Sequence, residues 1–153
     1  MTFYVEHSKI ETEQVEKRGE IMKLRLANSK DFKIFNDMYT RFVGECTLKS
    51  MPKKIYEDYV DKGAIYFAVE KDIVVGYAIV WAYKDGTAEI SHFYVTEKRK
   101  GYGTKFYKML ELEIREKNLD TVSLYCFWHE AELFWKQMGY RSAGDEKFYK
   151  KLQ

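Results

Sequence analysis

Three neighbouring segments in the middle of the chain constrain the fold more than any other feature of the sequence. Residues 64–70, 73–83 and 87–95 are rich in Ile, Val, Tyr and Phe, which favour extended strands. The residues between them, Lys71-Asp72 and Lys84-Asp85-Gly86, have the composition of tight turns. Two successive β-hairpins are therefore expected, and together they make an antiparallel meander.

Further strands and helices are expected on both sides of this meander. Residues 21–27 alternate as a half-buried strand, with Leu24 and Leu26 on its buried side. Asn28 or Ser29 can cap the helix that follows. That helix is expected to end at Gly44, and a second helix to run from Pro52 to about residue 61. After the meander, we expect a helix that begins after Gly103 and ends at Asn118, followed by a strand over 121–127. A short helix over 130–138 and a hairpin of 140–143 with 147–152 complete the chain. The order β-α-α-β-β-β-α-β-α-β-β predicts one α+β domain with a mixed sheet.

Composition narrows the class of protein. The 153 residues, 46% hydrophobic and 33% charged, suffice for one globular domain with a buried core. A net charge of only +2 argues against binding to nucleic acids or membrane surfaces. No apolar run is long enough to span a membrane, and Cys46 and Cys126 lack metal-ligand spacing, so we expect a cytoplasmic protein with reduced thiols and no metal site. Residues 1–20 stand apart as a helical N-terminal extension, and residues 21–153 form the domain.

The most informative motif is the basic, glycine-containing loop between the last meander strand and a helix. Gly101 and Gly103 let the backbone turn tightly and let a ligand approach it closely. The helix that follows offers amide N–H groups without intrahelical partners at the positive end of its dipole. Lys98, Arg99 and Lys100 add formal charge at the same place. These features predict a binding site for a phosphate or a pyrophosphate.

Two better-known glycine-rich loops do not fit this segment. The pattern Gly-x-x-x-x-Gly-Lys-Ser/Thr of a P-loop is absent from the sequence. A dinucleotide-binding fold would carry its glycines after the first strand of a parallel unit, with an acidic residue about 20 positions later. Here the glycines follow the fourth strand, at the end of an antiparallel meander.

The order of elements and the loop together resemble the GCN5-related N-acetyltransferase (GNAT) family. The family's pyrophosphate loop, Gln/Arg-x-x-Gly-x-Gly/Ala, is similar to Lys98-Arg99-Lys100-Gly101-Tyr102-Gly103, with Lys in the first place. Its later element, Asn-x-x-Ala-x-x-Phe-Tyr-x-x-x-Gly-Phe/Tyr, resembles residues 128–140, and Leu24-Arg25-Leu26-Ala27 with Asp31 is typical of its start. The resemblance covers residues 22–152 and implies a mixed, mostly antiparallel sheet of six to seven strands with helices on both faces.

What the resemblance implies is an N-acetyltransferase that uses acetyl-CoA as cosubstrate and a primary amine of a small molecule or a peptide as acceptor. The pantetheine arm would pair with the backbone of the fourth strand, and the pyrophosphate would lie on the loop amides. The residues expected to bind acetyl-CoA are Phe93, Tyr94, Val95, Lys98, Arg99, Lys100, Gly101, Tyr102, Gly103, Thr104, Trp128 and Trp135.

Glu89 is the candidate catalytic base. An amine attacks only in its neutral form, so a base must accept the proton of the ammonium. Family members with a glutamate base on this strand carry it at about the place of Glu89. In a regular strand Glu89 shares a face with Phe93 and Val95, whereas His92 lies on the other face unless a bulge intervenes.

Two positions depart from the family pattern. Trp135 stands where the family's general acid is a tyrosine, and Trp128 replaces its asparagine. An indole N–H is not a useful acid, so the leaving thiolate would take its proton from water or from the hydroxyl of Tyr102, Tyr125 or Tyr140. These departures support an alternative function, a catalytically weak or inactive module that binds acyl-CoA as a sensor or regulator.

Several of these residues also have structural interpretations. Glu89 could be a solvated or salt-bridged strand residue, and His92 and His129 are expected to be structural, His129 through capping of a helix. Nucleic-acid binding through the basic loop is a weaker third function, and residues 1–20 are a candidate contact for a homodimer. Three lysines near the C-terminus are predicted to form a solvated strand edge: Lys147, Lys150 and Lys151.

Overall fold

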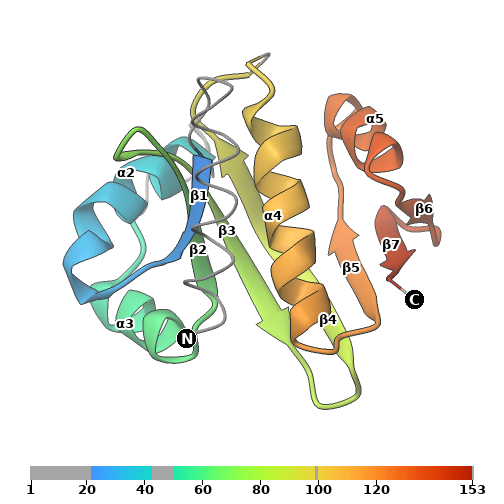
Figure 1. Cartoon of the computed structure of the whole chain (residues 1–153), viewed down its shortest axis with the longest axis horizontal. Helices are drawn as coiled ribbons and strands as arrows, with labels where there is room; N and C mark the ends of the chain where they lie inside the picture. Colours follow the sequence, from blue (N-terminus) through green and yellow to red (C-terminus); the bar gives the residue numbers. More distant parts are fainter. Residues whose placement is uncertain (1–21, 43–49, 99, 153) are drawn as a thin grey trace.

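The computed structural model describes residues 22–42, 50–98 and 100–152 of the chain. Its elements follow the order predicted from the sequence and form one seven-stranded sheet with helices on both faces (Figure 1). The strands are β1 (Met22–Leu26), β2 (Ile65–Glu70), β3 (Ile73–Ala82), β4 (Thr87–Val95), β5 (Thr121–Tyr125), β6 (Arg141–Ser142) and β7 (Lys147–Lys151). The helices are the 3-10 turn η1 (Ser29–Asp31), α2 (Phe32–Phe42), α3 (Lys53–Asp61), α4 (Tyr102–Glu116) and α5 (His129–Gln137).

Some expectations concern residues outside these ranges. Residues 1–20, Gly44, Cys46 and Arg99 are among them, so what the sequence predicts for them stays a prediction. Among the described residues, no helix is long and apolar enough to cross a membrane. In the same part of the chain, no group of three or more His, Cys, Asp or Glu side chains is arranged to hold a metal ion.

The sheet has the order β1-β2-β3-β4-β5-β7-β6, and every pair of neighbouring strands is antiparallel except β4 with β5. The predicted meander is formed by β2, β3 and β4, with Lys71 and Asp72 at φ 49° and 65° in its first turn and Gly86 at φ 88° in its second. Helix α4 carries the chain from the end of β4 to the start of β5, so these two strands run parallel. The prediction of an α+β fold with a mixed sheet is confirmed.

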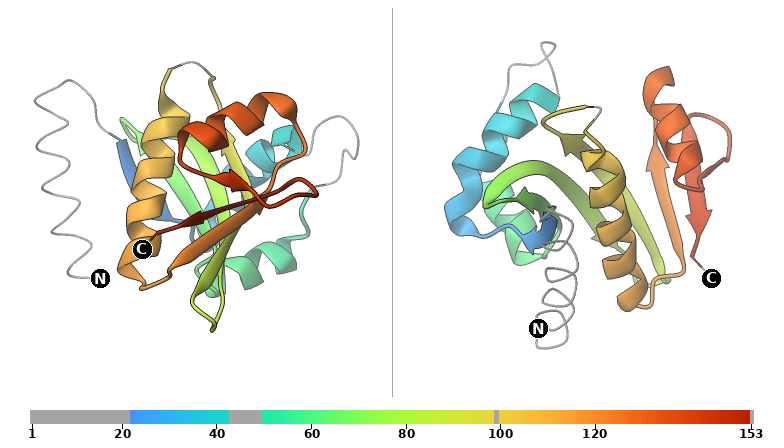
Figure 2. Two further views of the ribbon diagram at one scale, coloured as in Figure 1. Left: turned by 90° about the vertical axis from the view of Figure 1, so that its right-hand side faces the viewer. Right: turned by 45° about the horizontal axis from the view of Figure 1, so that its top comes forward.

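Two apolar cores lie on opposite faces of the sheet. Helices α4 and α5 cover one face, where Phe106, Leu110 and Trp135 pack against strand residues. Helices α2 and α3 cover the other face, where Phe35 and Tyr56 are completely buried. The left view of Figure 2 shows the sheet between α4 on one side and α2 and α3 on the other. Side chains from both faces of the sheet can therefore contribute to a site.

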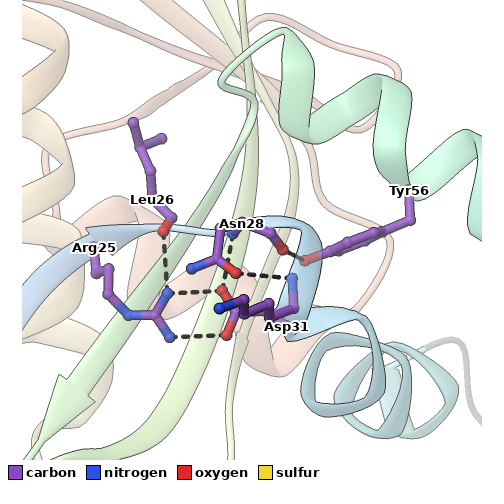
Figure 3. A network of polar contacts seen from close by, with 6 residues as sticks. Arg25, Leu26, Asn28, Asp31 and Tyr56 are labelled. Carbon is purple, nitrogen blue, oxygen red and sulfur yellow. Dashed lines mark hydrogen bonds and ion pairs between the residues drawn. The ribbon is translucent and has the colours of Figure 1, made fainter.

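A hydrogen-bond network fixes the junction between β1 and α2 (Figure 3). The Arg25 guanidinium donates to both carboxylate oxygens of Asp31, at 2.7 and 3.1 Å. Asp31 also accepts the backbone N–H of Asn28 at 2.8 Å, and the Tyr56 hydroxyl donates to the Asn28 carbonyl at 2.6 Å. Asn28 is the cap predicted from the sequence, and with Asp31 it forms a reciprocal capping box. The network ties the start of α2 to β1 and α3.

The prediction that Lys150 lies on a solvated strand edge is wrong. β6, not β7, is the edge strand, and Lys150 pairs with Glu111 of α4 and donates to the Met138 carbonyl at 2.7 Å. Tyr107 donates to Glu111 at 3.0 Å, and its hydroxyl lies 2.9 Å from that of Tyr140. Burial opposes the ionisation of Glu111, but the Lys150 ammonium and the Tyr107 hydroxyl hold its pKa below the ordinary value.

Other differences from the sequence-based expectations occur at the ends of elements. Leu26 is 47% exposed because it is the last residue of an edge strand. β5 ends at Tyr125 rather than at residue 127, and Cys126 follows it as a buried thiol. His129 does not cap α5, because Trp128 occupies the N-cap and His129 lies 3.5 Å from Glu132.

Candidate active site

The paired part of β4 and β5 is short. Residues 87–90 of β4 pair with residues 121–124 of β5, and beyond them the two strands separate (Figure 1). From residue 92 to residue 95, the backbone of β4 pairs with β3 on one side, and its other edge faces the opening toward β5. An open strand edge of this kind can pair with an extended amide chain. The opening ends at the loop that leads into α4.

A β-bulge at Ser91 decides which side chains of β4 share a face. The register between β3 and β4 shifts by one residue at this point. The bulge puts His92 on the same face as Glu89, whereas Phe93 and Val95 pack against the α4 side of the sheet. Of the two arrangements that the sequence leaves open, the structure has the one with a bulge, so Glu89 does not share a face with Phe93 and Val95.

Helix α4 begins directly after the glycine loop. Gly101 is its N-cap with a φ of 76°, a left-handed conformation that favours glycine. The amide of Lys105 donates to the Gly101 carbonyl at 3.2 Å, so the amides of residues 102–104 precede the intrahelical ladder. A Cβ on Gly103 would lie 3.3 Å from the ring of Phe134 in α5. The two glycines thus shape the helix start and let α5 approach it.

The charged groups of the loop differ in their surroundings. Lys98 is exposed. Lys100 forms an ion pair with Glu97 at 2.6 Å, and this hydrogen bond raises the pKa of the ammonium. The hydroxyl of Tyr102 is hydrogen-bonded to Glu70, which raises its pKa. In the described part of the loop, an anion would therefore meet Lys98 and the positive end of α4.

Phe93 and Trp135 support the α4 side of the opening. The Phe93 ring stacks on Phe106 at 4.9 Å and meets Trp135 edge-on at 5.2 Å. Trp135 is only 7% exposed and also contacts Tyr107 and Tyr140, so it is a core residue. Tyr140 is buried with it, and burial raises the pKa of its hydroxyl. Neither side chain is exposed as a proton donor.

Glu89 lies on the opposite face, next to the last residue pair of β4 and β5. The carboxylate is half-buried and accepts the hydroxyl of Tyr83 at 3.0 Å. Its neighbour on β5 is Ser123. The hydrogen bond to Glu89 also raises the pKa of the Tyr83 hydroxyl. The Glu89 carboxylate is thus oriented at the place where the opening begins.

The bulge turns His92 toward α2. Its Nδ1 lies 3.0 Å from the Tyr77 hydroxyl, and its ring is stacked on Tyr39 with centroids 5.6 Å apart and an interplanar angle of 2°. Phe42 lies 4.4 Å from the same ring. Burial lowers the pKa of His92 to about 4, so the imidazole is neutral near pH 7.

Phe42 and Trp128 meet from the two sides of the opening. Their ring centroids are 6.3 Å apart at an interplanar angle of 79°, and Trp128 is 61% exposed. The sequence predicts that the acceptor pocket is formed by the segment Tyr39–Pro52, the Glu89 strand and the region Trp128–Trp135, and Tyr39 and Phe42 lie in the first of these segments.

Comparisons with known proteins identify the family and the fold of the chain. The sequence profile of the acetyltransferase (GNAT) family matches residues 32–140. A search of curated proteins finds no match. The chain is similar in structure to Ard1 from Thermoplasma volcanium, with a TM-score of 0.68, 19% identity, and coverage of 86% of this chain and 98% of that one.

Two similar structures were solved with ligands. The PaiA N-acetyltransferase from Thermoplasma acidophilum, in complex with coenzyme A, has a TM-score of 0.71 and 12% identity over 86% of this chain and 99% of that one. YncA from Salmonella typhimurium, with acetyl-CoA, has a TM-score of 0.70 and 16% identity over 87% and 95% of the two chains. Because these sequence identities are only 12–19%, the structural similarity establishes the fold alone. Membership of the family is shown by the match to the family's sequence profile. The chain therefore belongs to the acetyltransferase (GNAT) family, whose enzymes use acetyl-CoA as the acetyl donor.

Proposed function

We propose that the protein transfers the acetyl group of acetyl-CoA to a primary amine of a small molecule or a peptide, by direct attack of the amine on the thioester. One observation carries this proposal. The open edge of β4, the glycine loop and the N-terminus of α4 follow one another along a single path. The strand edge suits an extended amide chain, and the helix terminus suits a diphosphate.

The residues along this path have distinct binding roles. Backbone groups of Phe93, Tyr94 and Val95 would pair with the pantetheine arm of acetyl-CoA. The amides of residues 102–104 would hold the pyrophosphate, together with the cations of the loop. Trp135 acts indirectly, since it contacts Phe93 at 5.2 Å from within the core.

Glu89 is the base in this proposal. Acetyl-CoA, when bound, supplies the thioester carbonyl that is attacked. The Glu89 carboxylate accepts the ammonium proton, directly or through one water molecule, so that the neutral amine attacks. A backbone N–H near Tyr94 or Val95 donates to the oxygen that becomes negative in the tetrahedral intermediate. The new C–N bond forms and the C–S bond breaks.

Protonation of the leaving thiolate is left to water. Trp135 is buried, and the Tyr140 hydroxyl is engaged by Tyr107 at 2.9 Å. A thiol with a pKa of about 8.5 is a tolerable leaving group near neutrality. A positioned acid contributes about 10²–10⁴-fold in rate, so a slower reaction is expected rather than none.

The replacements Trp128 and Trp135 favour a second candidate function, an acyl-CoA sensor without turnover. The two functions are separated by incubating the protein with acetyl-CoA and a panel of primary amines and following the release of free thiol. Thermal shift measures binding in parallel. Release with at least one amine supports the transferase. A thermal shift with acetyl-CoA but no release with any amine contradicts it and supports the sensor.

A further inference from the structure

Five aromatic side chains gather at the opening between β4 and β5. We name them the aromatic cluster: Tyr39, Phe42, His92, Tyr94 and Trp128. Phe42 lies at its centre, with ring centroids 4.4 Å from His92 and 6.3 Å from both Tyr94 and Trp128. Its ring is edge-on to the last two, at 90° and 79°.

The aromatic cluster lies beside the part of β4 that pairs with β3 but not with β5. His92 and Tyr94 flank Phe93, whose backbone is assigned above to the pantetheine arm. Trp128 is the N-cap of α5, and Phe42 is the last residue of α2. Figure 1 shows that α2 and α5 lie at opposite sides of the same end of the sheet. An acceptor that approaches the thioester from the α2 side would meet these rings.

The aromatic cluster has no formal charge near pH 7. Four of its members are neutral rings, and burial keeps His92 neutral by lowering its pKa to about 4. Among the described residues of β4, Glu89 is the carboxylate on this face, and it is already hydrogen-bonded to Tyr83 at 3.0 Å. The charges of a polycation would meet few opposite charges on this face, whereas a flat apolar group can stack on the rings.

We propose that the acceptor is a primary amine joined through a short chain to an aromatic ring, without a second cationic group. This inference rests on the proposed function and names its substrate class. The ring of the acceptor stacks against Phe42 and Trp128, and its amino group reaches the Glu89 side of the opening. Apolar surroundings also lower the pKa of the bound amine, which supplies the neutral nucleophile.

A kinetic comparison tests the inference. We would measure kcat/KM for 2-phenylethylamine, n-butylamine and spermidine with acetyl-CoA, in the wild-type protein and in Phe42→Ala, Trp128→Ala and Leu133→Ala. The aromatic amine should exceed the other two by about tenfold or more, and the first two variants should each reduce that preference by about three- to tenfold. Leu133 is 63% exposed on α5 outside the cluster, so Leu133→Ala is the matched control for Trp128, which is 61% exposed. A preference for spermidine, or one that neither cluster variant changes, overturns the inference.

A binding measurement separates this inference from the proposed function. 2-Phenylethylamine is titrated by calorimetry into protein saturated with coenzyme A, which carries no acetyl group. Saturable binding that weakens in both cluster variants supports the aromatic acceptor, even if no amine is ever acetylated and the transferase proposal fails. Lack of binding to the wild-type complex overturns the aromatic acceptor, while thiol release with other amines would leave the transferase proposal standing.

Discussion

The hydroxyl of Tyr77 lies 3.0 Å from Nδ1 of His92, and this contact joins the buried face of β3 to the side chain that the β4 bulge redirects. Tyr77 is completely buried, and burial raises the pKa of its hydroxyl, so it keeps its proton. Burial also lowers the pKa of His92. The folded protein therefore resists protonation of the imidazole at the centre of the candidate site.

Stability should fall between about pH 6.5 and pH 4 because of His92. Its pKa is about 4 in the folded protein against 6.5 ordinarily, so the unfolded chain binds the proton first as the pH falls. The contribution of the neutral His92 to the free energy of unfolding is fully present above pH 6.5 and is on the order of 3 kcal/mol. Urea unfolding of the wild-type protein and His92→Gln at about pH 7.5 and about pH 4.5 measures it. The variant should lose less stability between the two pH values, and an equal loss in both proteins would contradict the assignment.

Glu89→Gln should lower kcat by about 10²–10⁴-fold, because the amide cannot accept the ammonium proton. The affinity for acetyl-CoA should not change, since the base lies away from the loop and the helix terminus. Thiol release gives kcat, and thermal shift with acetyl-CoA gives binding. Glu116→Gln, at an exposed position of α4, is the control. Wild-type turnover in Glu89→Gln would remove Glu89 from the base role.

Gly101→Ala should weaken acetyl-CoA binding by about tenfold or more, because the backbone at the start of α4 must keep a positive φ. Gly144→Ala is a matched control in the β6–β7 turn. Both glycines have positive φ, 76° and 85°, and a Cβ on either would meet nothing within 4 Å. Each variant should lose about 1–2 kcal/mol of stability. If both variants keep wild-type affinity for acetyl-CoA in calorimetry, the loop does not hold the pyrophosphate.

Lys150→Met should reduce the free energy of unfolding by about 1–3 kcal/mol, because Glu111 is left without its cation in a largely enclosed place. The side chains of Lys150 and Glu111 are only 21% and 19% exposed. Lys151→Met, on the same strand but exposed, should change stability by no more than about 0.5 kcal/mol. Urea unfolding near neutral pH compares the two, and equal losses would show that the ion pair contributes nothing.

Much of the fold could be predicted because its signals are local. The turns at Lys71-Asp72 and around Gly86, the cap at Asn28 and the helical spacing of apolar residues each depend on a few neighbouring residues. The same holds for the anion-binding loop, since Gly101 and the helix after it are adjacent in sequence. These short-range patterns were sufficient for the order of elements and for the family resemblance.

Only the tertiary structure decided which side chains meet at the site. The face of His92 depends on a one-residue register shift against β3, which alternation along β4 does not reveal. The contact of Phe42 with Trp128 joins residues far apart in sequence across the opening. Lys150 likewise pairs with Glu111, because its side chain lies on the face of the sheet that α4 covers. Contacts of this kind form only when elements far apart in sequence pack together. The sequence by itself therefore determined the kind of domain, and the packing determined the surroundings of its reacting groups.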